Sequence, residues 1–506
     1  MKNENDLDLL VENFFDEYYY YFSSFATLRG IHRYDYKLSA YDRNELNNLR
    51  NLINDTTISL KSFEERNKNQ RTHDLKTFKK ILENTLGFID EGFFGNAQFF
   101  VFDAFLGIVS VALTQAKPMS IRSRNFAERL GTLKHINDYI RTYVINITDA
   151  ERKAVLKEID YLEYFINQFS TYLLTKSDTD KKENLKVEKT NAIETLTELR
   201  KLIKSIKTCT EIKLKGFLDF HNLDNSFVDL KRILEDTLTS TSENLIRKAR
   251  EIKIANPYKE TIKEIISTKE QFDETRVNDI INSVENTLRI PILPEKIEFE
   301  RRIFIDSSEF PDILSSLMGH AIPSGEFDLK KNVLFIIRNE ENYHMLVYKI
   351  LSNLLLGKPF VNFYRVGIKG KKKYFLNYLL YNGLPVYLRR TIFDEIKSQF
   401  GRAFELIYYY EEYVSTLKAY IQNEIYFRNW DILNIENFIN EDKILIDKER
   451  FMEEFIYDMG RSFLTAQGLN AIVELKKEKR LRPNEFIIKL LQNMHYPFSI
   501  IRQLIK

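Results

Sequence analysis

Histidine is the residue type in this sequence best suited to metal binding or proton transfer, and its spacing is restrictive. The chain has seven histidines, and none stands four residues from another, so no helix can present an H-x-x-x-H pair to zinc. His320 and His344 flank a predicted strand over 333–337, and with Glu326 they form a candidate alternative metal site. A packed or solvent-facing histidine is the simpler interpretation of each.

The single cysteine is a second candidate for chemistry. Cys209 lies close in sequence to four lysines, whose charges would lower the pKa of its thiol and raise its reactivity. A lone cysteine without an identifiable histidine partner is more often inert. The sequence contains no G-x-S-x-G, no Walker loop and no G-x-G-x-x-G, so acyl-hydrolase, nucleotide and dinucleotide functions lack motif support.

Two further patterns allow either a binding or a structural interpretation. Residues 367–373 (GIKGKKK) concentrate four lysines, which could hold an anionic partner or form a solvated loop. The tyrosine-rich segments 16–22 and 407–413 could line a groove, although aromatic residues at helical spacing more often belong to the core.

Composition places these residues in a globular protein with no clear charge excess. The 506 residues are 44% hydrophobic and 29% charged, with a formal net charge of +2. We therefore expect no nucleic-acid partner, because nucleic-acid binders usually carry a basic excess or a concentrated basic face. One cysteine excludes an intramolecular disulfide and is typical of a reducing compartment.

The sequence predicts a cytoplasmic protein that does not bind membranes. The start, MKNENDLDLLVENFFDEYYYYF, scatters acidic residues among its apolar positions, unlike a secretion signal. The most apolar stretch, Ala97–Leu113, is shorter than the roughly 20 residues that span a bilayer and carries Asp103 near its centre. We interpret it as a buried core helix.

Helical periodicity dominates the elements that must position these residues. Apolar residues recur at three- and four-residue steps over 150–174, 192–206, 227–237 and 240–254, which predicts amphipathic helices. The polar run 176–190 is the best candidate for an internal loop. Short strands are predicted over 297–305 and 333–337, followed by a helix over 341–356 that stops at Gly357.

The segment PILPEK, residues 291–296, is the clearest hinge because closely spaced prolines break helices. The sequence thus predicts a mainly α-helical region over 1–290 and a second region over 291–506 that combines a small β-sheet with helices. The predicted fold class is mainly α.

Three stretches, in order along the chain, resemble the "domain of unknown function 885" family, whose members resemble zinc metallopeptidases. Residues 25–35 (FATLRGIHRYD) are similar to the family's A-T-x-x-G-I-H-x-Y-D entry motif. Residues 323–337 are similar to the lead-in to its metal motif, and residues 492–502 (QNMHYPFSIIR) to its closing G-x-L-P-L-x-x-L-R. The resemblance implies a cleft-containing, zincin-type helical fold with a small sheet.

The resemblance also shows that the metal-binding residues are replaced. The family motif H-E-x-x-P-G-H-H, registered on Gly357, places neutral, apolar or cationic residues at its ligand and base positions. These are Ser352, Asn353, Lys358 and Pro359. A second motif, E-G-W-A-x-Y, reads Asn382-Gly383-Leu-Pro-Val-Tyr387 here, with Asn in place of Glu.

These replacements remove both the zinc site and the base that would activate water. Zinc needs imidazole, thiolate or carboxylate ligands, and a lysine ammonium would repel it. Asn353 has no titratable carboxylate. We therefore expect no metal and no cofactor.

Three functions follow in order of preference. The first is a catalytically inactive metallopeptidase-like protein that binds a peptide or protein through its cleft, with Gly383, Tyr387, His320 and His344 as candidate cleft residues. The second is an active hydrolase with ligands relocated to His320 and His344, or with metal-free chemistry. The third is a structural subunit of a larger assembly. The sequence does not specify an oligomeric state.

Overall fold

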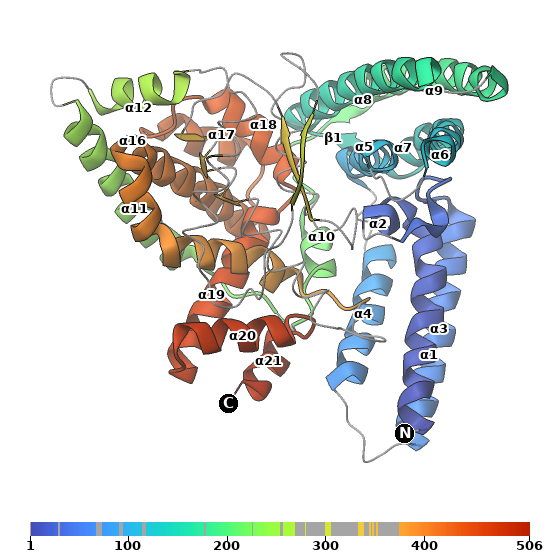
Figure 1. Cartoon of the computed structure of the whole chain (residues 1–506), viewed down its shortest axis with the longest axis horizontal. Coiled ribbons are helices and arrows are strands. Elements are labelled where there is room, and N and C mark those ends of the chain that lie inside the picture. Colours follow the sequence, from blue (N-terminus) through green and yellow to red (C-terminus); the bar gives the residue numbers. More distant parts are fainter. Residues whose placement is uncertain are drawn as a thin grey trace. The chain divides into compact units, whose positions relative to one another are not determined.

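Helices form nearly all of the regular structure in the described part of the chain (Figure 1). The computed structural model describes residues 2–28, 31–66, 73–90, 95–113, 118–176, 179–224, 226–253, 257–268, 279, 299–304, 332–337, 344–345, 347–348, 351–352 and 374–505. The mainly α-helical class predicted from the sequence is thus confirmed.

The chain divides into two compact units. The first comprises residues 1–220 together with Tyr374 and Phe375, and the second begins at His221 and includes the helices from Leu376 onward. The division predicted at residues 290 and 291 lies outside the described residues. The helices between 231 and 267, which that prediction assigned to the N-terminal region, belong to the second unit.

The first unit consists of helices and one minimal parallel strand pair. Its elements are α1 (Lys2–Tyr21), α2 (Ser23–Leu28), η1 (His32–Tyr34), α3 (Arg43–Arg66), α4 (His73–Asp90), α5 (Ala97–Leu113), α6 (Met119–Thr132), α7 (His135–Tyr143), β1 (Asn146–Ile147), α8 (Asp149–Lys176), α9 (Thr179–Ser205), β2 (Lys207–Thr208) and α10 (Lys215–Phe220).

Helix α5 is the central helix of this unit, with the bounds that the sequence predicts. Its apolar residues from Ala97 to Val111 are almost completely buried except Phe102, which is half-buried. Asp103 is also buried and accepts hydrogen bonds from Ser24 and Ser39. No described helix in the chain combines the length and apolar character needed to cross a membrane.

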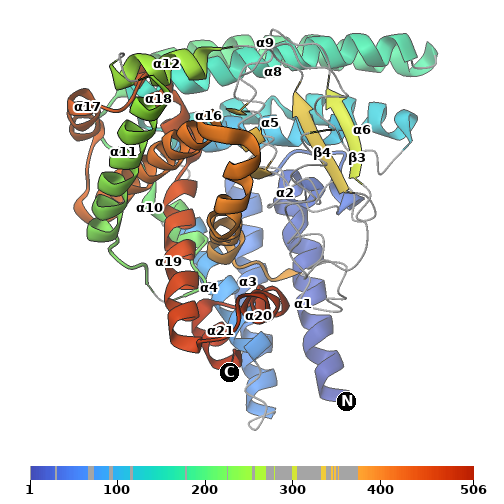
Figure 2. The same ribbon diagram turned by 60° about the vertical axis from the view of Figure 1, so that its left-hand side comes forward.

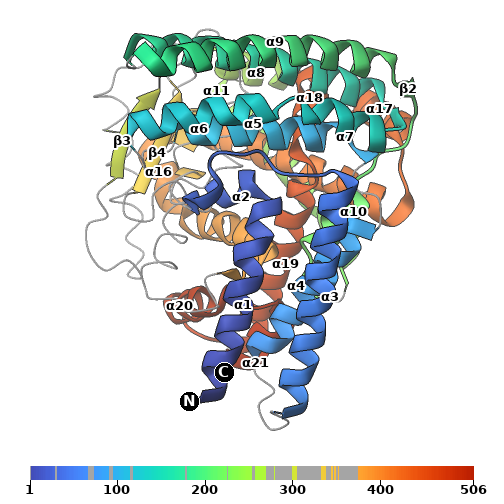
Figure 3. The same ribbon diagram turned by 90° about the vertical axis from the view of Figure 1, so that its right-hand side faces the viewer.

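Helices α8 and α9 run alongside each other (Figure 3) and correct one prediction. The helix expected over 150–174 is confirmed as α8, but the polar run expected to be a loop lies mostly within α9. Lys and Glu favour helices, and Leu185 in that run is buried. A polar run without glycine or proline therefore continues a helix whose apolar stripe is narrow.

The second unit combines helices with a second parallel strand pair. Its elements are α11 (Lys231–Ile252), α12 (Tyr258–Ser267), β3 (Phe299–Phe304), β4 (Asn332–Ile337), α16 (Tyr378–Arg428), α17 (Ile432–Glu441), α18 (Lys448–Asp458), α19 (Arg461–Lys479), α20 (Pro483–Asn493) and α21 (Phe498–Leu504).

Both strands predicted in the C-terminal half are confirmed. Strands β3 and β4 lie side by side and parallel (Figure 2), with Phe299 opposite Asn332 and Phe304 opposite Ile337. The helix predicted over 227–237 is correct only from Lys231, because residues 226–230 are not helical. We call residues 226–230 the strap.

Helix α16 reverses direction at Gly401, where φ is 76° and ψ is −172°. This left-handed backbone favours glycine, since other residues would place a Cβ against the chain. The two halves fold back on each other, and the rings of Phe393 and Tyr408 stack with centroids 3.7 Å apart. The tyrosine-rich segment 407–413 lies in this core, with Tyr408 and Tyr413 buried.

The first half of α16 crosses α19 at two glycines. A Cβ on Gly468 would overlap the carbonyl of Leu379, and a Cβ on Gly383 would overlap the backbone of Gly468. The absence of side chains at these positions lets the two backbones approach.

Replacing Gly468 by alanine should therefore destabilise the protein by about 2 kcal/mol, because the overlap is with backbone that can move only by separating the helices. Urea unfolding measures this. Gly87→Ala is the matched control, since a Cβ at this helical position meets nothing within 4 Å, and alanine should stabilise the helix by roughly 0.5 kcal/mol. Equal effects of the two substitutions would show that the crossing is not tight.

Candidate functional site

The helical residues before position 353 bring Ser352 to a buried polar cluster of the second unit. All described residues between 344 and 352 are helical, and His344, Tyr348 and Ser352 lie on one face because they are four residues apart. Val347 and Leu351 are completely buried in the hydrophobic core. The predicted end of this helix at Gly357 lies outside the described residues.

Arg389 of α16 binds the residue that the resemblance places at the first zinc-ligand position. Its Nη1 donates to the Ser352 hydroxyl at 2.9 Å, and its Nη2 forms an ion pair with Glu412. The neighbouring Arg390 donates to the other carboxylate oxygen of Glu412 from Nε at 3.0 Å. The reversal at Gly401 brings these residues together, because Arg389 and Glu412 lie on opposite halves of α16.

The cluster is charged although it is buried. Burial raises the pKa of Glu412, but Arg389 and Arg390 outweigh that effect and hold its pKa below the usual value. Burial lowers the pKa of Arg389, but Tyr348 and Glu412 raise it by more than burial lowers it. The net pKa is above the usual value, so the guanidinium stays protonated. It lies over the ring of Tyr348 at 4.7 Å, a favourable cation–π geometry.

A guanidinium bonded to Ser352 is incompatible with a metal ion at that hydroxyl. The serine is a neutral, weak ligand, and the adjacent positive charge would repel a dication. The donor set around Ser352 therefore does not fit zinc.

The second replaced motif is part of the packing of α16. The Asn382 side chain donates to the Tyr378 carbonyl of its own helix at 2.7 Å. Gly383, expected as a cleft residue, lies in the crossing with α19, and half-buried Tyr387 packs edge-on against Phe486. Among the described contacts, none joins Gly383 or Tyr387 to Ser352.

The structure describes only one of the remaining candidate metal residues. Half-buried His344 is described, whereas the other positions lie outside the described residues: His320, Glu326, Asn353, Gly357, Lys358, Pro359 and the lysine-rich run 367–373. Convergence of His320 and His344 stays a prediction. Within the described ranges, no three His, Cys, Asp or Glu side chains lie close enough together to hold a metal ion.

The environment of Cys209 differs from the one expected from its neighbours in sequence. Burial raises the pKa of its thiol, and Lys213 opposes this effect only in part. The Lys213 ammonium instead bonds to Asn146 at 2.7 Å and to the Gly95 carbonyl. The raised pKa opposes the reactive alternative and agrees with the inert cysteine that the sequence favoured.

The entry motif forms a buried network in the first unit. Asp35 accepts hydrogen bonds from Thr27 at 2.7 Å and contacts the His32 ring at 3.0 Å. The fully buried Arg129 of α6 donates to Thr27 at 2.6 Å and to the Gly107 carbonyl of α5. The motif residues therefore join α2 and η1 to α5 and α6.

Asp103 lies in the same network with Ser24 and Ser39. Burial raises its pKa to about 6, although hydrogen bonds from the two serines and the charge of Arg129 oppose the increase. Burial also lowers the pKa of Arg129 to about 10.

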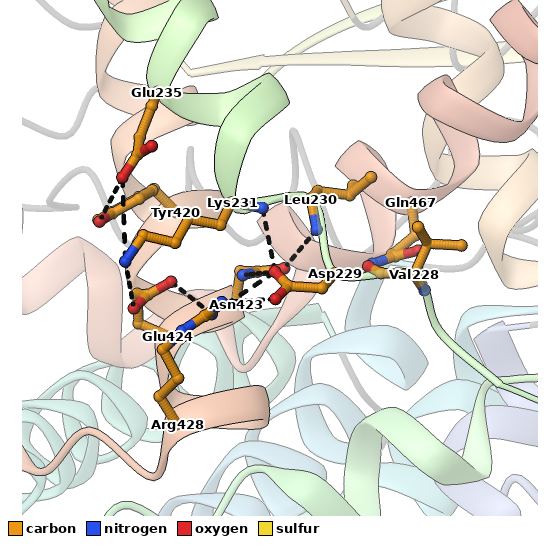
Figure 4. A network of polar contacts seen from close by, with 10 residues as sticks. All are labelled: Val228, Asp229, Leu230, Lys231, Glu235, Tyr420, Asn423, Glu424, Arg428 and Gln467. Carbon is orange, nitrogen blue, oxygen red and sulfur yellow. Dashed lines mark hydrogen bonds and ion pairs between the residues drawn. The ribbon is translucent and has the colours of Figure 1, made fainter.

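A second polar network of the second unit holds the strap (Figure 4). Gln467 of α19 accepts from the Val228 N–H at 3.1 Å and donates to the Val228 carbonyl at 2.5 Å. Asn423 of α16 accepts from the Leu230 N–H at 3.1 Å and donates to the Asp229 carboxylate at 2.8 Å. These bonds satisfy backbone groups that a continuous helix would have used, which explains why α11 begins only at Lys231.

Solved structures show that this fold exists elsewhere. The chain is similar to a candidate lipoprotein from Colwellia psychrerythraea, with a TM-score of 0.71, 11% identity and coverage of 100% of this chain and 99% of that one. It is also similar to a candidate lipoprotein of unknown function from Shewanella oneidensis, with a TM-score of 0.67, 13% identity and 98% coverage of each chain. At such identities the likeness establishes the fold alone.

Comparison of sequences adds no family assignment. No protein-family model matches the chain, and no curated protein matches it.

Sequence reasoning missed Arg389, Glu412, Asn423 and Gln467, which organise both networks of the second unit. One signal was available for Arg389, since it lies two residues after the E-G-W-A-x-Y-like motif. Asn423 and Gln467 are ordinary polar residues on helices, and their partners are 193 and 239 residues away.

Arg389 and Arg390 provide a matched pair for testing the cluster. Arg389→Met should lower the free energy of unfolding by about 3 kcal/mol, because it removes one partner of a buried ion pair. Arg390→Met, at a side chain that is 40% exposed, should cost less than about 1 kcal/mol. Urea unfolding of the two variants measures both losses. Equal losses would mean that Arg390 neutralises Glu412 as effectively as Arg389.

Asp103 predicts a specific pH dependence of stability. Its folded pKa of about 6 exceeds the value of an unfolded aspartate, so the neutral folded form is favoured at low pH and its contribution is lost as pH rises from about 4 to about 6. The stability of wild type relative to Asp103→Asn should fall over this window by at most about 3 kcal/mol. A difference that is constant between these pH values would contradict the assignment.

Proposed function

We propose that this chain is a catalytically inactive, metallopeptidase-like protein that binds a peptide or protein partner instead of cleaving it. The observation that supports this proposal most directly is the bond from Arg389 to Ser352, because Ser352 occupies the first-histidine position of the resembling motif. In this proposal the Arg389 guanidinium lies beside Ser352, the position at which an active metallopeptidase would have a zinc ligand.

The surroundings of Arg389 support the same conclusion. Glu412 is fully committed to the two arginines and lies buried between them, so it is not available as a metal ligand or as a base. The pKa of Glu412 is below its usual value, and a carboxylate with a lowered pKa is a weaker base. The cluster thus stabilises the fold of the helix that carries the motif.

Partner binding is one use of a scaffold without catalytic groups, since function depends on sites and not on the fold, and a structural role in a larger assembly is the alternative. The location stays a prediction. A single cysteine favours the cytoplasm, whereas the two structural neighbours are described as candidate lipoproteins, which points to a membrane-associated alternative.

Metal content tests the proposal directly. Protein purified without chelators or a histidine tag should contain less than about a tenth of an equivalent of zinc by elemental analysis, before and after incubation with zinc, since structural or catalytic zinc normally survives purification.

Near one equivalent of zinc that is lost in His344→Ala, but retained in the exposed control His135→Ala, would instead restore an active metal hydrolase with relocated ligands. Cleavage of a randomised peptide mixture by the zinc-loaded protein, detected by mass spectrometry, would confirm that alternative.

A further inference from the structure

The strap is held as an extended peptide by the surface that α16 and α19 present to it. We call this surface the strap-binding surface and define it by five residues: Asn423, Tyr426, Arg428, Phe463 and Gln467. The carboxamide of Gln467 pairs with both backbone groups of Val228, as a neighbouring strand would (Figure 4). Recognition of backbone groups in this way does not depend on the side chain at that position.

Two side chains of the strap are buried, with two exposed residues between them. Phe227 is buried edge-on against Phe463 at 4.8 Å and Tyr426 at 5.3 Å. Val228 points outward and is 55% exposed. Asp229 is exposed as well, so the buried side chains of the strap are Phe227 and Leu230.

The acidic position accepts from two side chains of the strap-binding surface and from the Lys231 backbone N–H at 3.1 Å. The Asp229 carboxylate accepts from Arg428 at 2.5 Å and from Asn423 at 2.8 Å. Burial tends to raise its pKa, but these donors hold it below the usual value. Leu230 then follows as a buried aliphatic residue.

Charged neighbours restrict which ligand can occupy the surface. Glu424 is buried, and it pairs with Arg428 at 2.8 Å and with Lys231 at 3.6 Å. Glu235, which accepts from Tyr420, lies beyond them. Arg428 is thus the cation that faces the acidic position, and Glu424 disfavours a second acid beside it.

Asn423 and Gln467 would lose these partners if the strap left the surface. Both are almost completely buried with the strap in place, and backbone groups match their donors and acceptors, so the pair favours a surface occupied by a peptide segment. Combined backbone pairing and side-chain pockets are how peptide-binding proteins recognise extended ligands.

We propose that the strap-binding surface is a peptide-recognition site that the chain's own strap fills. The ligand class is an extended peptide with the pattern aromatic–any–acid–aliphatic, which matches Phe227–Leu230. This inference rests on the proposed function for the existence of a peptide partner, and it names the place and the pattern. A tethered strap has a millimolar effective concentration, so a free peptide competes only when the strap is loosened.

The test uses the full-length chain with a loosened strap, Phe227→Ala/Asp229→Ala, and a fluorescent peptide of residues 224–231 (DNSFVDLK) with blocked ends. Anisotropy should show saturable binding to the loosened variant, with wild type at least about tenfold weaker. Adding Arg428→Ala to the loosened variant should weaken binding about tenfold, because a charged hydrogen bond to the peptide's acid is lost.

Two peptide controls define the pattern. Alanine at the valine position should bind unchanged, because Val228 is exposed, whereas alanine at the phenylalanine position should abolish binding. The inference would be overturned if the loosened variant kept the circular dichroism of wild type but did not bind the DNSFVDLK peptide or its valine-to-alanine variant. The proposed function would still stand or fall on zinc content and peptide cleavage, which are measured independently.

Hydrogen exchange of wild type keeps the inference testable if the loosened variant does not fold. The N–H groups of Val228 and Leu230 should exchange through local opening, faster than that of buried Ala419 in α16. If the N–H groups of Val228, Leu230 and Ala419 all exchange only when the whole unit unfolds, the strap does not leave its surface in the folded protein. That result would overturn the inference.

Discussion

The ion pair between Arg389 and Glu412 is the constraint on which the second unit depends. Both side chains are buried, so neither charge is tolerable without the other. Their pairing requires the two halves of α16 to lie against each other, which in turn requires the left-handed backbone at Gly401. The same guanidinium fixes Ser352, and thereby the helix that contains it, to this hairpin.

A buried arginine has a comparable role in the first unit. Arg129 connects Thr27, in the entry motif, to the backbone of α5, and its charge is offset by Asp35 and Asp103. In both units, residues that a motif would mark as functional take part in satisfying a buried charge. Removing one partner of a buried polar network is costly, so Thr27 and Ser352 are constrained by the buried arginine that each contacts.

The strap extends the same physics to recognition. Gln467 and Asn423 are buried amides that need partners, and an extended segment supplies its backbone to them. A surface of this kind specifies backbone direction through amides and sequence through the pockets for Phe227 and Asp229. The guanidinium bound to Ser352 and the backbone pairing at the strap-binding surface are both consistent with the proposal of a protein that holds a peptide.

The sequence by itself determined the elements whose signal is local. The apolar run of α5, the period of α8 and the β-branched residues of β4 predicted these elements correctly, because burial of a continuous or periodic apolar face depends on neighbours in the chain. The run 176–190 was missed because a helix with a narrow apolar stripe has the composition of a loop. Only the tertiary structure decided that Arg389 binds Ser352, that Gln467 binds Val228, and that the strap interrupts a helical pattern. Such pairs join residues 37 and 239 positions apart, and their energy arises only when folding has excluded water from both partners.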